Sequence, residues 1–118
     1  MNSYRELLVW QKSIELTTET YRMTELYPKS EVYGLTSQIR RAAISIASNI
    51  AEGWSRKNIK EYNQFLRIAR GSAAELETQL LVSKNVGLLN TSNFDRFSQS
   101  RTSIMKMLNA LITSLNRL

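Results

Sequence analysis

Four segments of this sequence repeat their apolar residues at alternating spacings of three and four, which is the period of one face of an α-helix. The segments cover residues 7–24, 39–50, 66–83 and 94–118. None of them alternates apolar and polar residues as a half-buried strand does. The spacing therefore restricts the chain to an all-α fold.

Each repeat predicts the side chains that face the interior. The seam of the first helix is predicted to contain Leu7, Trp10, Ile14, Thr17, Tyr21 and Thr24. The second helix is predicted to bury Ile39, Ala43, Ile46 and Ile50, and the third Leu66, Ala69, Ala73, Leu76, Leu80 and Ser83. The fourth seam is Phe94, Phe97, Arg101, Ile104, Leu108, Leu111, Leu115 and Leu118. Seams of this kind are typical of helix bundles.

Proline, glycine and N-cap residues predict where the first two helices begin and end. The only proline, Pro28, ends the first helix, which we expect over residues 4–26, because the residue before a proline is pushed out of the helical region. Thr36 or Ser37 is the expected N-cap of the second helix. Gly53 is the expected C′ residue that closes it.

The same signals place the other two helices. Asn58, with Glu61 three residues later, indicates a capping box that opens the third helix. Gly87 is expected to end that helix, and Thr91 or Ser92 to cap the fourth. Four helices joined by short loops predict one domain over residues 1–118, an up-down-up-down antiparallel four-helix bundle.

Small residues lie where an exposed helix face normally carries long charged ones. A second face of the second helix contains Arg41, Ser45, Ser48 and Glu52, so another backbone could approach it closely. Gly71 lies inside the third helix, where glycine costs about 1 kcal/mol relative to alanine, and we expect a close neighbour there too. This pattern indicates a protein that assembles with other subunits.

Composition excludes several classes of function. Cysteine and histidine are both absent, which removes disulfides, thiolate metal sites and the commonest general base and metal ligand. No apolar run approaches the ~20 residues that span a bilayer, and the N-terminus does not resemble a signal peptide. We therefore expect a cytoplasmic, non-enzymatic protein with no catalytic residue, no metal site and no cofactor.

The net charge of +6 is concentrated in one part of the chain. Between residues 36 and 70, seven basic residues face only two acidic ones, a balance of 7 − 2 = +5. Such asymmetry indicates a face that attracts polyanions, and the alternative is a solvated basic surface that aids solubility.

Three stretches together resemble a known bacterial family: VWQKSIEL (9–16), YPKSEVYGLTSQIRRAAISIASNIAEG (27–53) and EYNQFLRIARGSAAELETQL (61–80). The family is that of the four-helix-bundle proteins found as reading frames within 23S rRNA intervening sequences, also called S23 ribosomal proteins. The resemblance covers nearly the whole chain and is weakest in the fourth helix. It implies a ring-like homo-oligomer, typically a pentamer. The accessory protein of diversity-generating retroelements is similar and works with a reverse transcriptase and nucleic acid, which makes contact with RNA or DNA plausible here by analogy.

The candidate nucleic-acid-binding residues are all basic. They are Arg40, Arg56, Lys57, Lys60, Arg67 and Arg70. Lys57, Lys60 and Arg67 are spaced to share one helix face near the start of the third helix, where free backbone N–H groups also favour anions. The alternative is a solvated face with pairs such as Lys57 to Glu61. For Arg40, a phosphate and an acidic side chain are equally suitable partners.

A second group of residues is predicted to be structural. Arg41, Asn49, Glu52 and Glu75 are expected to form a polar network within the bundle or at a subunit contact. The helix dipole disfavours a cation near an N-terminus, so Arg41 should have an anionic partner. We favour an acidic residue on a neighbouring helix or subunit, such as Glu52, Glu75 or Glu77, and the alternative is a phosphate. Trp54 is expected to anchor the core or a neighbouring subunit.

Two functions therefore remain in view. The first is a homo-oligomeric bundle that binds RNA or DNA through phosphates and reads no sequence. The second is a protein–protein scaffold or accessory subunit whose basic surface receives an acidic protein partner, such as a reverse transcriptase. No membrane partner is expected.

Overall fold

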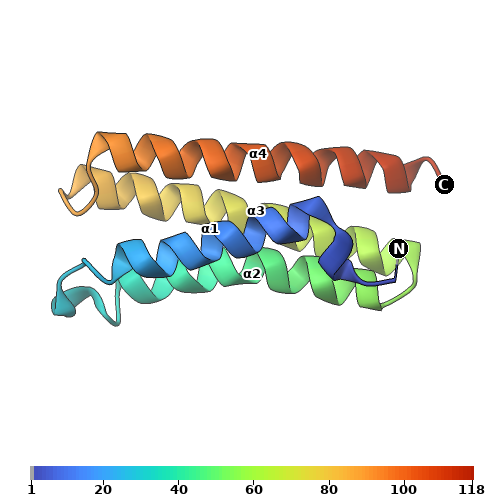
Figure 1. Ribbon diagram of the computed structural model, residues 1–118, viewed down its shortest axis with the longest axis horizontal. Helices are drawn as coiled ribbons and strands as arrows, with labels where there is room; N and C mark the ends of the chain where they lie inside the picture. Colours follow the sequence, from blue (N-terminus) through green and yellow to red (C-terminus); the bar gives the residue numbers. More distant parts are fainter. Residues whose placement is uncertain (1) are drawn as a thin grey trace.

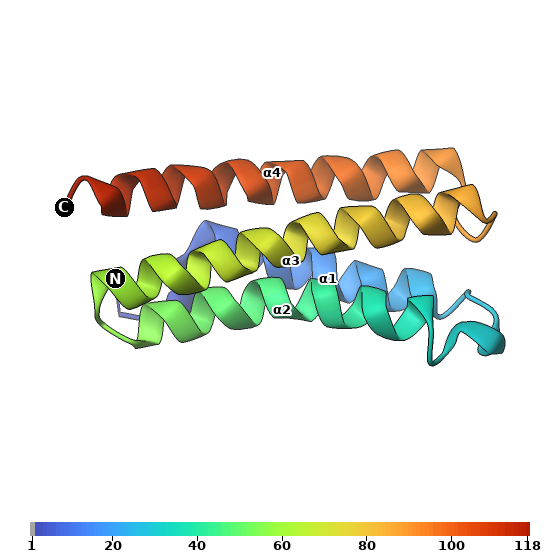
Figure 2. The same cartoon turned by 180° about the vertical axis from the view of Figure 1, so that it is seen from behind.

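The computed structural model describes residues 2–118, which form four long antiparallel helices (Figures 1 and 2). The elements are the 3-10 helix η1 (Tyr4–Glu6), α1 (Leu8–Thr24), the 3-10 helix η2 (Lys29–Glu31), α2 (Leu35–Ser55), α3 (Ile59–Asn85) and α4 (Thr91–Asn116). The principal dimensions are 46 × 22 × 20 Å. The predicted all-α, up-down-up-down four-helix bundle is confirmed. None of the helices described is long and apolar enough to cross a membrane.

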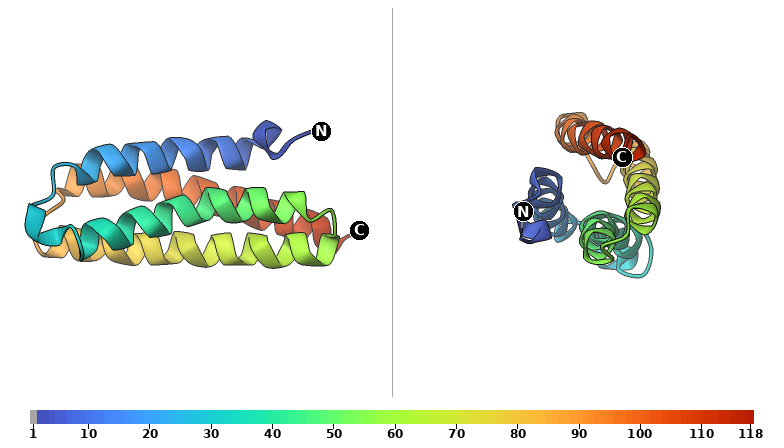
Figure 3. Two further views of the ribbon diagram at one scale, coloured as in Figure 1. Left: turned by 90° about the horizontal axis from the view of Figure 1, so that it is seen from below. Right: turned by 90° about the vertical axis from the view of Figure 1, so that its right-hand side faces the viewer.

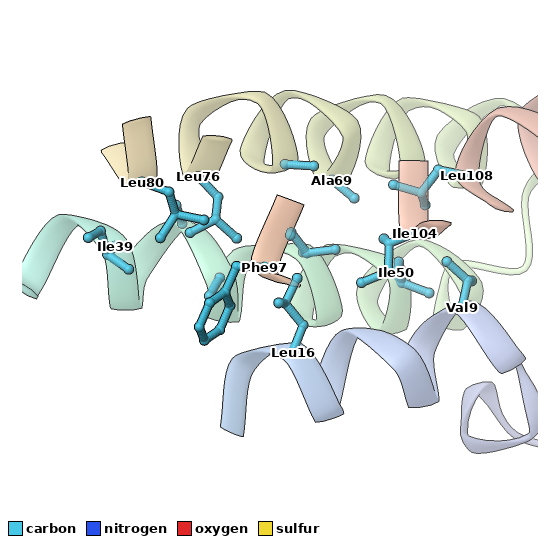
Figure 4. Close-up of a cluster of buried hydrophobic side chains, with 14 of the residues drawn as sticks. Val9, Leu16, Ile39, Ile50, Ala69, Leu76, Leu80, Phe97, Ile104 and Leu108 are labelled. Carbon is cyan, nitrogen blue, oxygen red and sulfur yellow. The ribbon is translucent and has the colours of Figure 1, made fainter. Parts of the chain in front are cut away.

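The helices follow one another around the bundle axis in chain order, as the end-on view in Figure 3 shows. Side chains from all four helices converge on one core (Figure 4). The predicted seams of α2 and α3 are confirmed at every position, since all ten side chains are buried with no exposed surface. The α4 seam is confirmed in part: Phe97, Ile104 and Leu108 are buried, whereas Leu118 is exposed and the buried Ile112 was not predicted. The other predicted positions, Phe94, Arg101, Leu111 and Leu115, are half-buried.

The predicted seam of α1 is right at Thr24, which is buried, but wrong in its middle part. The buried residues of α1 are Val9, Ser13, Leu16, Thr20, Met23 and Thr24. Ile14 and Tyr21, which were predicted to be buried, are exposed. The hydroxyls of Ser13 and Thr20 tolerate burial because each donates to a backbone carbonyl four residues earlier, at 2.7 Å. This local bond removes the cost that normally keeps polar side chains out of a seam.

The predicted start of the first helix also needs correction. Tyr4 begins a separate 3-10 turn, whose N-cap Ser3 accepts a hydrogen bond from the Arg5 amide at 3.1 Å. Leu7 then adopts an extended conformation (φ −74°, ψ 122°), so α1 begins only at Leu8.

Two predicted N-caps are displaced along the chain. Neither Thr36 nor Ser37 caps α2, because the N-cap is Gly34 and the Glu31 carboxylate accepts from the Leu35 amide at 3.1 Å. The cap of α4 is Asn90, whose side-chain oxygen accepts from the Asn93 amide at 2.7 Å.

Gly53 does not end α2 but lies inside it, contrary to the prediction. A Cβ atom built on Gly53 would lie 2.7 Å from Cβ of Phe65 and 3.0 Å from Cδ1 of Tyr62 on α3. Glycine is therefore required by the close crossing of α2 and α3 rather than by a helix end.

The other helical glycine behaves in the opposite way. Gly71 is exposed, and apart from the adjoining backbone of α3 nothing among residues 2–118 comes within 4 Å of a Cβ at this position, so the expected close neighbour is missing within the chain. Gly87 ends α3 as predicted, with φ 84° and a hydrogen bond from the Leu88 amide to the Ser83 carbonyl at 2.8 Å.

Candidate nucleic-acid interface

The turn between α2 and α3 presents the first of the predicted basic residues. Lys57 is exposed and adopts the left-handed conformation, with φ 56°. Asn58 follows as the predicted N-cap of α3, and its side-chain oxygen accepts from the Glu61 amide at 3.0 Å. The second bond of the predicted capping box, from the Asn58 amide to the Glu61 carboxylate, is not formed among the described residues. Lys57 therefore precedes α3 and does not share its helical face, which corrects the predicted spacing argument.

Lys60 and Arg67 lie two turns apart on the outward face of α3, and both are exposed. Among residues 2–118, neither they nor Lys57 form an ion pair with a carboxylate, and the alternative pair of Lys57 with Glu61 is not formed. These three residues, which we call the cationic strip, are therefore available to an external anion.

Arg56 and Arg70 flank the cationic strip, but each is already held within the chain. Arg56 donates to the Glu52 carboxylate at 2.8 Å and lies over the ring of Phe65. Arg70 donates to the side-chain oxygen of Asn109 at 3.0 Å, which ties α3 to α4. Both can add charge to the surface, but neither is as free to reorient as the strip.

Arg40 lies elsewhere, against the end of α1. Its guanidinium donates to the Thr24 hydroxyl at 2.8 Å, to the Tyr21 carbonyl at 3.1 Å and to Glu25 at 3.3 Å. It also covers the ring of Tyr21. A cation at this position satisfies carbonyls at a helix C-terminus and complements the helix dipole, so the partners of Arg40 are those of a helix cap.

The predicted polar network forms only in part. The Asn49 amide donates to the Ser45 carbonyl at 2.8 Å and to the Ser45 hydroxyl at 2.9 Å, and the Ser72 hydroxyl continues the chain to Ser45 at 2.9 Å. Glu52 pairs with Arg56 instead. Sequence reasoning missed Ser72 because a serine facing inward from α3 is recognised only once α2 is seen beside it.

Arg41 and Glu75 line one groove of about 700 Å³ between α2 and α3, together with Ser45 and Gln79. Within residues 2–118, no ion pair joins Arg41 to a carboxylate, and the side-chain oxygen of Gln79 is buried without a hydrogen-bond partner. The expected acidic partner of Arg41 is therefore not supplied by the chain itself.

Trp54 belongs to an aromatic cluster at the same end of the molecule as the cationic strip. Its ring meets the Tyr4 ring edge to face at 6.4 Å, and the Tyr4 ring meets Trp10 at 5.2 Å. The cluster fastens η1 over the end of α2. Trp54 thus contacts the chain's own N-terminal segment, while one side of its ring lines a surface pocket.

One further cation reaches this end of the bundle only through the fold. Asn63 of α3 donates to Asn116 of α4 at 2.8 Å, which brings the exposed Arg117 to the end of the bundle that carries Lys57 and Lys60. An antiparallel fourth helix brings Arg117 close to Lys57 and Lys60, although these residues are far apart in the sequence.

Among residues 2–118, no group of three or more acidic side chains is arranged to hold a metal ion. The fold and this surface define the chain as a basic, antiparallel four-helix-bundle protein.

The comparisons with known proteins name its family. The family model described as 23S rRNA-intervening sequence protein matches residues 5–110, so the chain belongs to that family, as its sequence motifs indicate. A search of curated proteins finds no match.

A similar crystal structure is that of a protein of unknown function from the S23 ribosomal protein family of Bacteroides thetaiotaomicron. It aligns with a TM-score of 0.83 and 23% sequence identity, over 90% of this chain and 96% of that one. At this identity the likeness establishes the fold.

Proposed function

We propose that this protein is a non-enzymatic, cytoplasmic, homo-oligomeric bundle that binds RNA or DNA through phosphates. The observation that carries the proposal is the cationic strip, Lys57, Lys60 and Arg67, whose charges are exposed and have no carboxylate partner among residues 2–118. Arg56 and Arg70 supply additional positive charge beside it. Arg40 is left out of the proposed site because its guanidinium caps α1.

Phosphate binding by such a surface releases counterions and depends steeply on salt. Three contacts on a single strand correspond to a slope of log K against log salt of about −2 per subunit, at ~0.7 per phosphate. A ring of subunits repeats the strip, and multivalency strengthens contacts that are individually weak.

The homo-oligomer, for which a pentamer is our working model, is supported by the family resemblance and by the outer surface of α2 and α3. Ile44, an exposed apolar residue, lines the groove that holds Arg41 and Glu75, and Ile68 on α3 is an exposed apolar residue as well. A second copy of the chain in this groove supplies Arg41 with the acidic partner that it lacks within the chain. Light scattering tests this part, and a monomeric mass contradicts it.

Charge reversal provides a matched test of the cationic strip. The triple variant K57E/K60E/R67E and the control R22E/K29E/K106E both change the net charge from +6 to 6 − 6 = 0, and the control residues are exposed cations outside the strip. We expect the first variant to lose affinity for a labelled RNA or DNA strand and to flatten its salt dependence by about 0.7 per removed contact on a single strand. The control variant should lose only the small part of the affinity that depends on the net charge of the protein.

Fluorescence anisotropy at low salt measures both quantities, and light scattering verifies that the mass is unchanged. Equal losses in the two variants would move the site away from the strip. If the wild-type protein retains neither strand at low salt, the nucleic-acid proposal fails. A protein partner that co-purifies from the native cell and leaves at high salt would then favour the scaffold function.

A further inference from the structure

A pocket of about 440 Å³ opens at the end of the bundle where α2 turns into α3. Figure 3 shows this turn beside the N-terminal segment. The pocket is lined by Asn2, Trp54, Lys57, Asn58, Ile59 and Tyr62. Its volume lies within the ~300–1,000 Å³ that is typical of small-molecule sites. It combines two aromatic rings with a lysine that belongs to the cationic strip.

The aromatic walls of the pocket are held in place from behind. The Trp54 ring rests edge to face on Tyr4, which in turn rests on Trp10. The Tyr62 ring lies against the position where Gly53 has no Cβ, with 3.0 Å between that Cβ position and Cδ1. Burial raises the pKa of the Tyr62 hydroxyl above its ordinary value. Walls that are already ordered cost little entropy when a ligand enters.

The polar groups of the pocket suit a flat, polar-edged ligand with a phosphate attached. Asn58 uses its side-chain oxygen to cap α3, and none of the hydrogen bonds among residues 2–118 engages its amide NH₂ group. Lys57 is exposed at the same turn and has no carboxylate partner in that range. Aromatic faces beside a cation are the arrangement that binds unpaired bases in single-stranded nucleic acid.

We infer that this pocket receives one unpaired nucleobase of a nucleic acid whose adjoining phosphates lie on Lys57 and Lys60. The inference rests on the proposed function and extends it, because it selects single-stranded over double-stranded nucleic acid. The bases of a duplex are stacked inside the helix and cannot enter, whereas the cationic strip by itself attracts both forms. The pocket carries no sequence code, since every base has a face that stacks.

The first test uses the two aromatic walls and a matched surface tyrosine. We expect Trp54→Leu and Tyr62→Leu each to lose about tenfold in affinity for a single strand and to keep the affinity for a duplex of the same length. Tyr62→Phe retains the ring and should bind as the wild type does. Tyr33→Leu is the control, because Tyr33 is 98% exposed and belongs to the α1–α2 connection at the other end of the bundle.

The second test follows the pocket directly. The chain has two tryptophans, so Trp10→Phe leaves Trp54 as the single indole probe. Saturating single strand should quench its emission, and a duplex should not. Emission that stays unchanged with a bound strand overturns the inference, as do equal losses for both strand types in the leucine variants.

The outcomes separate this inference from the proposed function. If the wild type binds both strand types equally and depends on the cationic strip, the function stands and the pocket does not. If Trp54 emission follows the protein concentration rather than the added strand, a second copy of the chain fills the pocket. A leucine variant that has lost its fold is recognised by its melting temperature, which is compared with that of Tyr62→Phe.

Discussion

The two helix pairs α2–α3 and α1–α4 both join neighbouring antiparallel helices, yet they pack differently. Between α2 and α3, Gly53 lies directly against Phe65, and small buried residues such as Ala69 let the helices approach closely. Between α1 and α4 lies a polar groove of about 300 Å³, with Leu16 and Ile104 as its buried residues. Small side chains bring the inner faces of α2 and α3 into direct contact, and the groove of Arg41 and Glu75 lies outside that contact. Charged and hydroxyl side chains instead line the space between α1 and α4.

This difference in packing decides which helix pair supports the candidate site. The α2–α3 pair holds the turn that carries Lys57 and the wall that carries Tyr62. The α1–α4 pair closes the bundle with few direct contacts, among them the ion pair of Glu19 with Arg96 at 2.8 Å. The candidate site therefore rests on the more tightly packed half of the molecule.

The largest expected effect compares one leucine from each pair. Leu76→Ala should reduce the free energy of unfolding by about 4–5 kcal/mol, because the enclosed core leaves a cavity. Leu16→Ala should cost about 2–3 kcal/mol, because water from the adjoining groove can fill the space. Urea unfolding at one fixed protein concentration measures both, and equal losses would contradict the proposed contrast.

The second effect concerns the close crossing of α2 and α3. Gly53→Ala should destabilise the protein by about 1–3 kcal/mol, because the new Cβ meets Phe65 Cβ, which lies next to the α3 backbone and cannot move aside. A melting temperature equal to that of the wild type would show that the helices separate without cost.

Gly71→Ala, in the same pair of helices, should have the opposite effect on stability to Gly53→Ala. Apart from the adjoining backbone of α3 itself, no atom among residues 2–118 lies within 4 Å of the new Cβ, so alanine should stabilise α3 by about 0.5–1 kcal/mol. Thermal melting gives the sign. A loss of stability accompanied by a smaller assembly would reveal a second copy seated on Gly71.

The third effect appears in alkaline solution. Burial raises the pKa of Tyr27 and Tyr62 above 10.0 in the folded protein, and for Tyr27 this outweighs the opposing influence of the nearby Ser83 hydroxyl, with which it makes no well-formed hydrogen bond. Above about pH 10 the unfolded chain releases these protons while the folded chain retains them, so the free energy of unfolding falls as pH rises.

Tyr27→Phe and Tyr62→Phe should each flatten that fall, and unfolding curves collected between about pH 8 and pH 11 measure it. Tyr33→Phe is the control, since this side chain is 98% exposed. An unchanged slope in both variants would mean that other groups cause the alkaline loss.

The smallest effect belongs to the α1–α4 pair. Arg96→Ala removes the ion pair with Glu19, whose two side chains are about half exposed, and should cost no more than about 1 kcal/mol. The cost should shrink further at high salt because exposed charges are screened. Urea unfolding at low and high salt measures this, and a salt-independent loss would indicate that Arg96 contributes by packing on Phe97.

Much of the bundle follows from local pattern, and the failures have specific causes. The seams of α2 and α3 are predicted correctly because their interior positions are small or aliphatic without exception. The α1 seam is misassigned because Ser13 and Thr20 bury their hydroxyls through local bonds, which leaves Ile14 exposed. Gly53 is misread as a helix end because close packing and helix termination both favour glycine.

The candidate site shows the same division. The basic character of residues 56–70 is visible in the sequence, whereas the pairing of individual cations is not. Arg40 and Lys57 each belong to a pair of adjacent basic residues, yet Arg40 caps a neighbouring helix and Lys57 stays free. The pocket beside Trp54 needs η1 folded back over the end of α2, which local spacing does not predict.

The sequence by itself determined the helical fold, the order of the helices and the excess of positive charge, because these depend on periodicity and composition along neighbouring residues. Only the tertiary structure decided which side of α1 is buried, why residue 53 must be a glycine, and which cations remain unpaired. Those outcomes depend on contacts between residues that are far apart in the chain. The free charges of Lys57, Lys60 and Arg67 are therefore a property of the packed bundle.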